Sequence, residues 1–452
     1  MKMKLRDIID SPCGLRYVID SLPLASGYAL RYLMDTEALT APEDIAAAYS
    51  RMREHLSAAG DGNLVSMLHS ILCSLKDISH TLSRIEAGST VDDIELFEVK
   101  ALILLGRRVS AVLEKASQAS IAPHTGGLED ALKVLDPDGT EIASFYIYDS
   151  YSPELAALRA DIRREADADR RTDLMDREQA LEAGIREELC RTLRPSVLAL
   201  RKLQEELARL DIDLAKAVQM LRMRLCIPEI STSGVTSYKG MYNPYVKEVV
   251  ERAGGEFTPI DLSFGDGPVV IIGANMGGKT VVLKTAALCQ WLFCFGMGIP
   301  AEEAVIAPRE RVFFISGDAQ DMGAGLSSFA AEMKAIDGVV RASAEAPDGS
   351  RIAAMIDEPA RSTNPIEGTA LVEALVDILG QRDVALLLTT HYNIPSSHCT
   401  RLRVRGMEDG KMNYRLCPAP ECDVPHEALK VAESLNISPE WTGKAKKLLE
   451  YE

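Results

Sequence analysis

The chain has 452 residues, of which 47% are hydrophobic and 26% are charged. This is the composition of a globular protein with room for two or three domains. The formal net charge is −17 at pH 7, and both halves of the chain share the acidic excess. Because non-specific DNA affinity comes mainly from basic groups that neutralise phosphates, the balance disfavours strong nucleic-acid binding, although folding can still create a local basic patch.

The cysteines and the apolar segments indicate a reducing compartment. The nine cysteines show no tight metal-binding spacing, and the Cys417–Cys422 pair is looser than a zinc knuckle, so reduced thiols are expected. The first residues, Met1 to Arg6, are too charged for a signal peptide. The apolar stretch 281–300 contains Lys284, which favours a core helix over a membrane span. We therefore expect a cytoplasmic protein without membrane partners.

The pattern of residues 1–152 predicts a mainly helical domain. Apolar residues recur at helical spacing in 45–56, 64–85 and 91–113. A short β excursion is expected over 131–148, where a turn at 136–139 lies between segments of strand-like character.

Residues 153–225 read as a long antiparallel helix pair that could act as a lever. Helix formers with dense charge and a thin apolar stripe fill this stretch, and the reversal is expected before Gly184. A solvated helical hairpin that only spans domains would give the same pattern.

The second half predicts an α/β domain over residues 226–423. A linker rich in Pro, Ser, Thr and Gly is expected at 227–240, and a hairpin at 402–416. Two short helices, 426–435 and 439–449, fall in a C-terminal segment, 424–452. Apolar strands alternate with helices, which implies a parallel sheet flanked by helices. The predicted strands are 269–272, 312–315, 352–356 and 384–388.

The most informative motif is a G-x-x-x-x-G-K-[ST] loop between the strand 269–272 and a predicted helix, 281–295. It comprises Gly273, Ala274, Asn275, Met276, Gly277, Gly278, Lys279 and Thr280. In such a loop, backbone N–H groups and the N-terminus of the following helix point into the same site, where they can bind a polyphosphate. Lys279 would reach the β- and γ-phosphates of ATP, and Thr280 would ligate Mg²⁺. A chance match is the alternative, which the flanking strand and helix oppose.

Three further segments follow in the order that a nucleotide-hydrolysing site needs. Asp357 and Glu358 end an apolar strand, where they would serve the Mg²⁺ shell and the attacking water. His391 ends the next strand and is predicted to sense the γ-phosphate. The segment 325–333 has a Gly and two Ser residues at the start of a predicted helix. These residues would either contact phosphate or form an ordinary helix cap. Arg361 could serve the site or a dimer contact.

Together, the segments 273–280, 325–333, 355–368 and 390–392 closely resemble the MutS family of ATPases. The resemblance is strong over about 238–452 and weaker over 1–225. It implies an α/β P-loop ATPase domain of the ATP-binding-cassette type, preceded by a helical core and lever. Gln320 makes the chain look more like the second bacterial branch of the family, which is not a mismatch-repair branch. Ala274 departs from the family, which usually has Pro there.

The resemblance also implies roles for individual residues and a dimer. Phe257 falls where the family stacks an aromatic ring on adenine. Gln320 is also expected to bind the nucleotide. Lys279 and Thr280 take phosphate and Mg²⁺, and Asp357 is the second Mg²⁺ residue. Glu358 and His391 are the catalytic pair. Ser327 would reach the nucleotide of a partner subunit, which is either a second copy or a related MutS-like chain, and the C-terminal helices would dimerise.

Three functions remain open at this stage. The first is a dimeric ATPase whose closure moves helical levers against a protein partner. By resemblance alone, that partner could be an adenosylcobalamin-dependent aminomutase in need of reactivation. The second is a DNA-binding repair or recombination ATPase for mismatched or branched DNA. We expect the mismatch-reading and clamp domains to be missing, which favours the first. The third is a structural dimer with a decayed site, which the intact Lys279 and Glu358 oppose.

Overall fold

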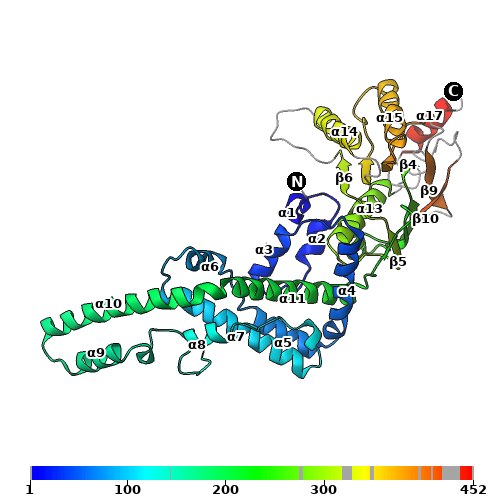
Figure 1. Cartoon of the computed structure of the whole chain (residues 1–452). Helices are drawn as coiled ribbons and strands as arrows, with labels where there is room; N and C mark the ends of the chain where they lie inside the picture. Colours follow the sequence, from blue (N-terminus) through cyan, green and yellow to red (C-terminus); the bar gives the residue numbers. More distant parts are fainter. Residues whose placement is uncertain are drawn as a thin grey trace. The chain divides into compact units, whose positions relative to one another are not determined.

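A computed structural model describes residues 3–142, 144–273, 278–317, 328–346, 351–394, 399–408, 411–419 and 438–449. The chain divides into two compact units (Figure 1). The first comprises Met1–Leu22, Thr36–Ser50 and Gln219–Glu452, and the second comprises Pro23–Asp35 and Arg51–Val218. Across the described residues, no helix combines the length and the apolar character that crossing a bilayer requires.

The regular elements of the second unit, over its described residues, are all helices. Its helices are α3 (Gly27–Asp35), α5 (Gly62–Leu72), α6 (Ser79–Glu86), α7 (Asp93–Lys115), α8 (Glu129–Leu135), α9 (Pro153–Arg164), α10 (Ala168–Leu193) and parts of α4 (Pro42–Ala59) and α11 (Val197–Met223). Short 3₁₀ turns lie at Ala119–Ile121, Asp149–Tyr151 and Arg194–Ser196.

The predicted helices 45–56 and 91–113 are confirmed as α4 and α7, and α7 begins with a capping box. The Asp92 carboxylate accepts from the Glu95 N–H, and the Glu95 carboxylate accepts from the Asp92 N–H. The predicted helix 64–85 is instead two helices, α5 and α6. The break is fixed locally, because the Asp77 carboxylate accepts the Ser79 N–H at the start of α6.

The predicted β excursion over 131–148 is wrong. Residues 129–135 form α8, and the described residues between 136 and 148 include no strand. The expected hairpin turn is organised by a buried ion pair, in which Lys100 Nζ lies 3.1 Å from Asp136 Oδ1. Lys100 Nζ also donates to the Ser144 carbonyl and lies 3.2 Å from the Tyr148 hydroxyl. The segment folds around one buried ammonium group, which a period-2 pattern does not reveal.

Replacing Lys100 by Met should destabilise the helical unit by about 3 kcal/mol, because the buried Asp136 carboxylate would lose its counter-ion. The double variant with Asp136→Asn should recover at least about 1 kcal/mol of that loss. Chemical denaturation followed by circular dichroism measures both.

Burial raises the pKa of Asp136, but hydrogen bonds from the Glu141 N–H, Lys100 and Thr140 outweigh it and hold the pKa below its usual value. The Asp136 contribution is therefore present above about pH 4 and lost as the pH falls through the lowered folded pKa. Equal stability of the single and double variants would contradict this account.

Helices α9 and α10 form the antiparallel pair, and the chain reverses at residues 165–167 (Figure 1). Gly184 lies inside α10 and does not mark the reversal. The Ser152 hydroxyl caps α9, with Pro153 in its first turn, and the Asp167 carboxylate caps α10. Among the residues of α10, those that are buried lie near its C-terminal end, at Leu189, Cys190 and Leu193.

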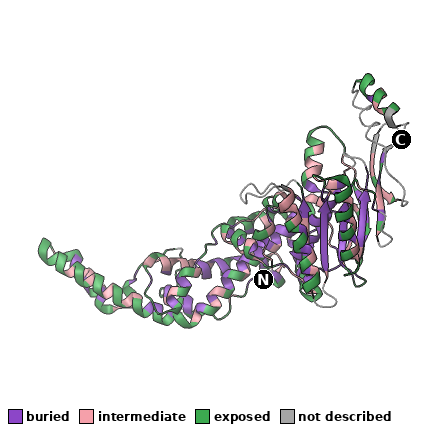
Figure 2. Ribbon diagram, turned by 90° about the horizontal axis from the view of Figure 1, so that it is seen from above, coloured by how far each residue is buried: buried purple, intermediate pink, exposed green. Residues whose placement is uncertain are grey.

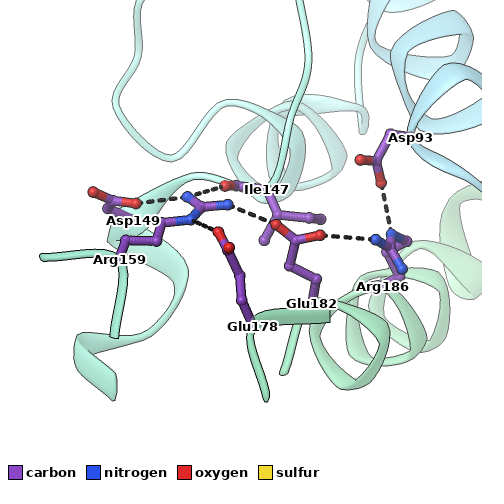
Figure 3. A network of polar contacts seen from close by, with 7 residues as sticks. All are labelled: Asp93, Ile147, Asp149, Arg159, Glu178, Glu182 and Arg186. Atoms are coloured by element: carbon purple, nitrogen blue, oxygen red, sulfur yellow. Dashed lines mark hydrogen bonds and ion pairs between the residues drawn. The ribbon is translucent and has the colours of Figure 1, made fainter. Parts of the chain in front are cut away.

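Polar contacts hold the middle of this pair (Figure 3). Arg159 of α9 donates to Asp149, Glu178 and Glu182, at 2.6, 2.7 and 2.7 Å, and to the Ile147 carbonyl at 2.7 Å. Partial burial lowers the pKa of Arg159, but the three carboxylates raise it above its usual range. Glu182 also binds Arg186, which donates to Asp93 of α7 at 2.7 Å. The guanidinium groups thus join α9, α10 and the start of α7.

The substitution Arg159→Ala should release α9 from α10, because it removes four charge-assisted or carbonyl hydrogen bonds at a site where the arginine is 16% exposed. We expect amide hydrogen exchange in 153–182 to accelerate by about tenfold, as a loss of about 1.4 kcal/mol implies. Arg163→Ala, on the exposed side of the same helix, is the matched control. Similar exchange in both variants would show that the network does not hold the pair.

The first unit contains a six-stranded sheet in the order β10-β9-β4-β8-β7-β6. Its strands are β4 (Gly267–Ile272), β6 (Arg311–Ser316), β7 (Ile352–Asp357), β8 (Ala385–Thr389), β9 (Thr400–Glu408) and β10 (Lys411–Pro418). The four predicted apolar strands are confirmed as β4, β6, β7 and β8, which run parallel with β9. The predicted hairpin is the antiparallel pair β9–β10. Its expected turn at Asp409–Gly410 lies outside the described residues.

Helices pack on both faces of this sheet. Helix α13 (Lys279–Cys294) contacts β6, β7 and β8, whereas α14 (Ser328–Glu345) and α15 (Pro365–Gly380) pack against the other face. Alternate residues such as Val270, Ile356 and Leu388 share the core with α14 and α15. The strands are buried on both faces, which explains their continuous apolar runs (Figure 2).

The predicted linker 227–240 is wrong in part, because it contains two strands of a second sheet. This sheet has the order β1-β5-β2-β3, with β1 (Glu229–Ile230), β2 (Thr236–Met241), β3 (Ile260–Phe264) and β5 (Glu303–Ile306). Thr236 and Tyr238 are buried, and the Thr236 hydroxyl accepts the Ala307 N–H. Gly234 precedes β2 and Gly240 lies inside it, both at positive φ, and these two glycines gave the segment a turn-like composition.

The remaining elements of the first unit are α1 (Leu5–Ile8), α2 (Leu15–Asp20), α12 (Pro244–Arg252) and α17 (Pro439–Leu449). Helix α17 confirms the second predicted C-terminal helix. The first, 426–435, lies outside the described residues.

Candidate nucleotide site

A cavity of about 540 Å³ lies at the carboxyl ends of the parallel strands, beside the start of α13. It collects residues from distant parts of the sequence: Val246, Val250, Glu256, Phe257, Thr258, Ile260, Gly278, Lys279, Thr280, Val281, Glu358, Arg361 and Tyr414. This is the edge of an open α/β sheet at which ligands bind. Five of the predicted site residues line it, namely Phe257, Gly278, Lys279, Thr280 and Glu358.

The turn into α13 leaves Gly278 at φ +77°, as the residue before the helix. A Cβ atom there would lie 3.0 Å from the Tyr414 ring, so both the backbone angle and the packing require glycine. Gly273 directly follows β4. The predicted ligands Ala274, Asn275, Met276 and Gly277, and likewise Gln320 and Ser327, lie outside the described residues.

Lys279 is the buried cation of the site. Its side chain is 3% exposed, and its Nζ donates to the Gly273 carbonyl at 2.7 Å and lies 3.4 Å from Glu358 Oε1. Burial lowers the pKa of Lys279, and the neighbouring Glu358 opposes that effect. A buried ammonium group needs an anion beside it, which Glu358 supplies here.

Glu358 is surrounded by three cationic or potentially cationic groups. His391 Nε2 lies 2.5 Å from its Oε1, and Arg361 Nη1 lies 3.0 Å from its Oε2, in addition to Lys279. Burial raises the pKa of Glu358, but the hydrogen bond and charge of His391, with Lys279 and Arg361, bring it down to about 2. The structure thus brings Glu358, His391 and Lys279 together, as the sequence predicted, and adds Arg361.

Asp357 ends β7 beside Glu358 and is 8% exposed. The Thr389 hydroxyl donates to Asp357 Oδ1 at 2.6 Å and accepts the Glu358 N–H at 3.0 Å. Thr389 therefore fixes both acids, a role that sequence reasoning missed. The only signal was its place at the end of β8, two residues before His391.

The oxygen donors fit Mg²⁺ better than a softer metal. A threonine hydroxyl and a carboxylate, from Thr280 and Asp357, are hard ligands of the kind Mg²⁺ prefers. Within the described part of the chain, no group of three or more His, Cys, Asp and Glu residues could hold a metal ion. Mg²⁺ commonly binds through few protein ligands together with waters and phosphates, so this donor set is sufficient.

Part of the lining of the cavity is apolar and aromatic. Val246 and Val250 of α12, with Phe257, line it, and Tyr414 of β10 adds a second aromatic ring. Such a surface suits the flat, largely apolar faces of a nucleobase. Phe257, which the resemblance placed at the base, lines the cavity, whereas Tyr414 and the two valines were not predicted.

The fold and this cluster define a mixed α/β domain with its polar groups at the carboxyl edge of a parallel sheet. Residues 269–408 match the family model MutS domain V, which is a domain of the P-loop ATPase type. The chain thus contains a MutS-family domain, and its similarity to MutS2 proteins covers about half of it.

Relatives named "Endonuclease MutS2" share this half of the chain. The one from Caldanaerobacter subterraneus subsp. tengcongensis is 30% identical over 230 residues, which cover 50% of this chain and 28% of the relative. The protein from Caldicellulosiruptor saccharolyticus is 34% identical over 189 residues, covering 41% and 23%. That from Fusobacterium nucleatum subsp. nucleatum is 29% identical over 255 residues, covering 54% and 31%. The chain thus matches less than a third of each relative's length.

Replacing Thr389 by Val should lower the free energy of unfolding of the α/β unit by about 1–3 kcal/mol, because the buried Asp357 carboxylate would lose a hydroxyl donor. Thr389→Ser keeps the hydroxyl and should cost less than about 1 kcal/mol. Urea denaturation followed by tryptophan fluorescence measures the difference, since Trp291 lies in α13. A Ser variant as unstable as the Val variant would assign the loss to packing.

Proposed function

We propose that this chain binds ATP with Mg²⁺ and hydrolyses it. The observation that carries the proposal is that Lys279 and Glu358, which His391 contacts, line one cavity together with the aromatic side chains Phe257 and Tyr414. Mg²⁺, when bound, would neutralise the charge of the phosphates, with Thr280 and Asp357 as its protein ligands. The backbone of the loop that follows Gly273 would bind the phosphates, and Phe257 the base.

The contacts of Glu358 support a proposed order of events in the reaction. Phosphate oxygens would replace the Glu358 carboxylate as the partner of Lys279, because they carry more charge at the same place. Glu358 would then be free to orient a water molecule and accept its proton. The water oxygen bonds to the γ-phosphorus, the bond to the β-phosphate oxygen breaks, and ADP leaves with the electron pair. His391, 2.5 Å from Glu358, would hold the γ-phosphoryl oxygens and keep the carboxylate in place.

The order of the strands supports this arrangement. Strand β8, with His391 just after it, lies between β4, which leads to Lys279, and β7, which ends in Asp357 and Glu358. The three groups therefore reach the site from adjacent strands, as in the ATP-binding-cassette type of sheet that the sequence implied. We further propose that Ser327 completes the site of a partner subunit and that dimer closure moves the helices of the second unit.

Two targets of that motion have support. The names of the relatives favour action on nucleic acid. The net charge of −17, and the continuous helical character of 153–223 without a strand insert, favour a protein partner. The aminomutase expected from family resemblance belongs to the second possibility.

The decisive measurement is ATP hydrolysis by the purified chain with and without Mg²⁺, compared with Glu358→Gln. The variant should bind ATP but hydrolyse it at least about 100-fold more slowly, because it lacks a base for the attacking water. Equal rates in the two proteins would contradict the assignment of Glu358.

The same assay with duplex and branched DNA separates the two targets. Stimulation that falls as salt rises would establish phosphate contacts and reject the protein-partner proposal. Unchanged rates across all of these DNAs would reject action on DNA.

A further inference from the structure

The chain makes an unusual turn directly after β7. Glu358 has φ +48° and Ala360 has φ +60°, a left-handed conformation that residues with a Cβ atom rarely adopt. Ala360 is fully buried, so solvent does not stabilise its peptide groups. A left-handed alanine persists only where the surrounding structure fixes it.

Two side chains from other elements bind the peptide groups on either side of Ala360. The Tyr392 hydroxyl donates to the Ala360 carbonyl at 2.9 Å, and the Glu332 carboxylate of α14 accepts the Ala360 N–H. The Thr363 N–H also donates to that carbonyl, at 3.2 Å, which closes the turn from within. Both hydrogen-bonding groups of Ala360 are thus held from outside the turn.

The approach of Tyr392 depends on a glycine in α15. A Cβ atom at Gly368 would lie 2.7 Å from the Tyr392 ring carbon Cζ, closer than real contacts allow. Gly368 lies in the interior of α15, where glycine is otherwise unfavourable. Glycine at position 368 of α15 therefore lets the Tyr392 ring approach the helix backbone closely.

The turn sets the position of the reacting carboxylate. Glu358 lies two residues before Ala360 and Arg361 lies directly after it, and the two form an ion pair at 3.0 Å. Glu358 also contacts Lys279 and His391. If Ala360 relaxed to an ordinary negative φ, the direction of the backbone between Glu358 and Arg361 would change. The carboxylate could not then keep all three contacts.

We propose that Tyr392 and Glu332 are positioning residues, which hold Ala360 in its left-handed conformation and thereby aim Glu358 at the attacking water. This inference rests on the proposed ATP hydrolysis. Tyr392 follows His391 at the end of β8, and Glu332 lies in the first turns of α14. Two neighbours of the site are therefore linked to Glu358 through one residue, Ala360.

The test compares Tyr392→Phe in two backgrounds, the natural chain and Ala360→Gly. In the natural chain, Tyr392→Phe should lower the single-turnover rate of ATP cleavage by about three- to tenfold, with the Kd for ATP changed less than about twofold. Glycine adopts positive φ without strain, so the hydroxyl should matter less there, and the same substitution should cost less than about twofold in the Ala360→Gly background. Tyr146→Phe, at an exposed tyrosine of the helical unit, is the matched control and should change neither quantity.

A loss of equal size in both backgrounds would overturn the proposal, because the hydroxyl would then act otherwise than through Ala360. So would an unchanged rate in Tyr392→Phe, or a rise in Kd that matches the loss of rate. Glu332→Gln provides the same comparison should Tyr392→Phe fail to fold, since it weakens the acceptor of the Ala360 N–H. If the natural chain itself does not cleave ATP, the proposed function fails, whereas cleavage that is indifferent to Tyr392 and Glu332 rejects only the positioning role.

Discussion

The α/β unit depends on one electrostatic constraint, the burial of the Lys279 ammonium group. A cation that is 3% exposed must have an anion and hydrogen-bond acceptors beside it, since burying it alone would cost several kcal/mol. Glu358 and the Gly273 carbonyl supply them. Glu358 is only 12% exposed and needs further cations of its own, which His391 and Arg361 provide. The charges of the site are therefore mutually dependent, and removing one leaves another uncompensated.

This constraint explains why the supporting contacts are so specific. The Thr389 hydroxyl donates to the Asp357 carboxylate and accepts the Glu358 N–H. One side chain therefore orients two adjacent acids with different proposed roles, the Mg²⁺ ligand Asp357 and the base Glu358. The left-handed residues Glu358 and Ala360 direct the chain away from the strand immediately after those acids. Strain at this turn and burial of the charges are two parts of one arrangement, because the turn allows Glu358 to reach Lys279 while Asp357 remains in the strand.

Much of this domain could be predicted from the sequence. Buried parallel strands read as continuous apolar runs, so 269–272, 312–315, 352–356 and 384–388 were found, and with them Lys279, Glu358 and His391 at their ends. The short strands β1 and β2 were missed, since turn residues at Gly234 and Gly240 dominate the local composition. The β excursion failed because Lys100, 36 residues before Asp136, decides the conformation there. Thr389, Tyr414 and Tyr392 act through contacts that no local pattern records.

The nucleotide site and the α9–α10 pair use charge in opposite ways, and this difference bears on how the helix pair responds to a partner. At the site, Lys279 is buried and Glu358 is 12% exposed, and His391, which follows the strand between theirs, contacts Glu358. In the α9–α10 pair, the buried apolar residues of α10 lie near its C-terminal end, whereas the part that packs on α9 relies on Arg159 and its three carboxylates (Figures 2 and 3). Such partly exposed ion pairs weaken with salt and exchange readily with external charges. A binding partner with a charged surface can therefore compete for these groups, while the buried cluster around Lys279 is protected from the same competition.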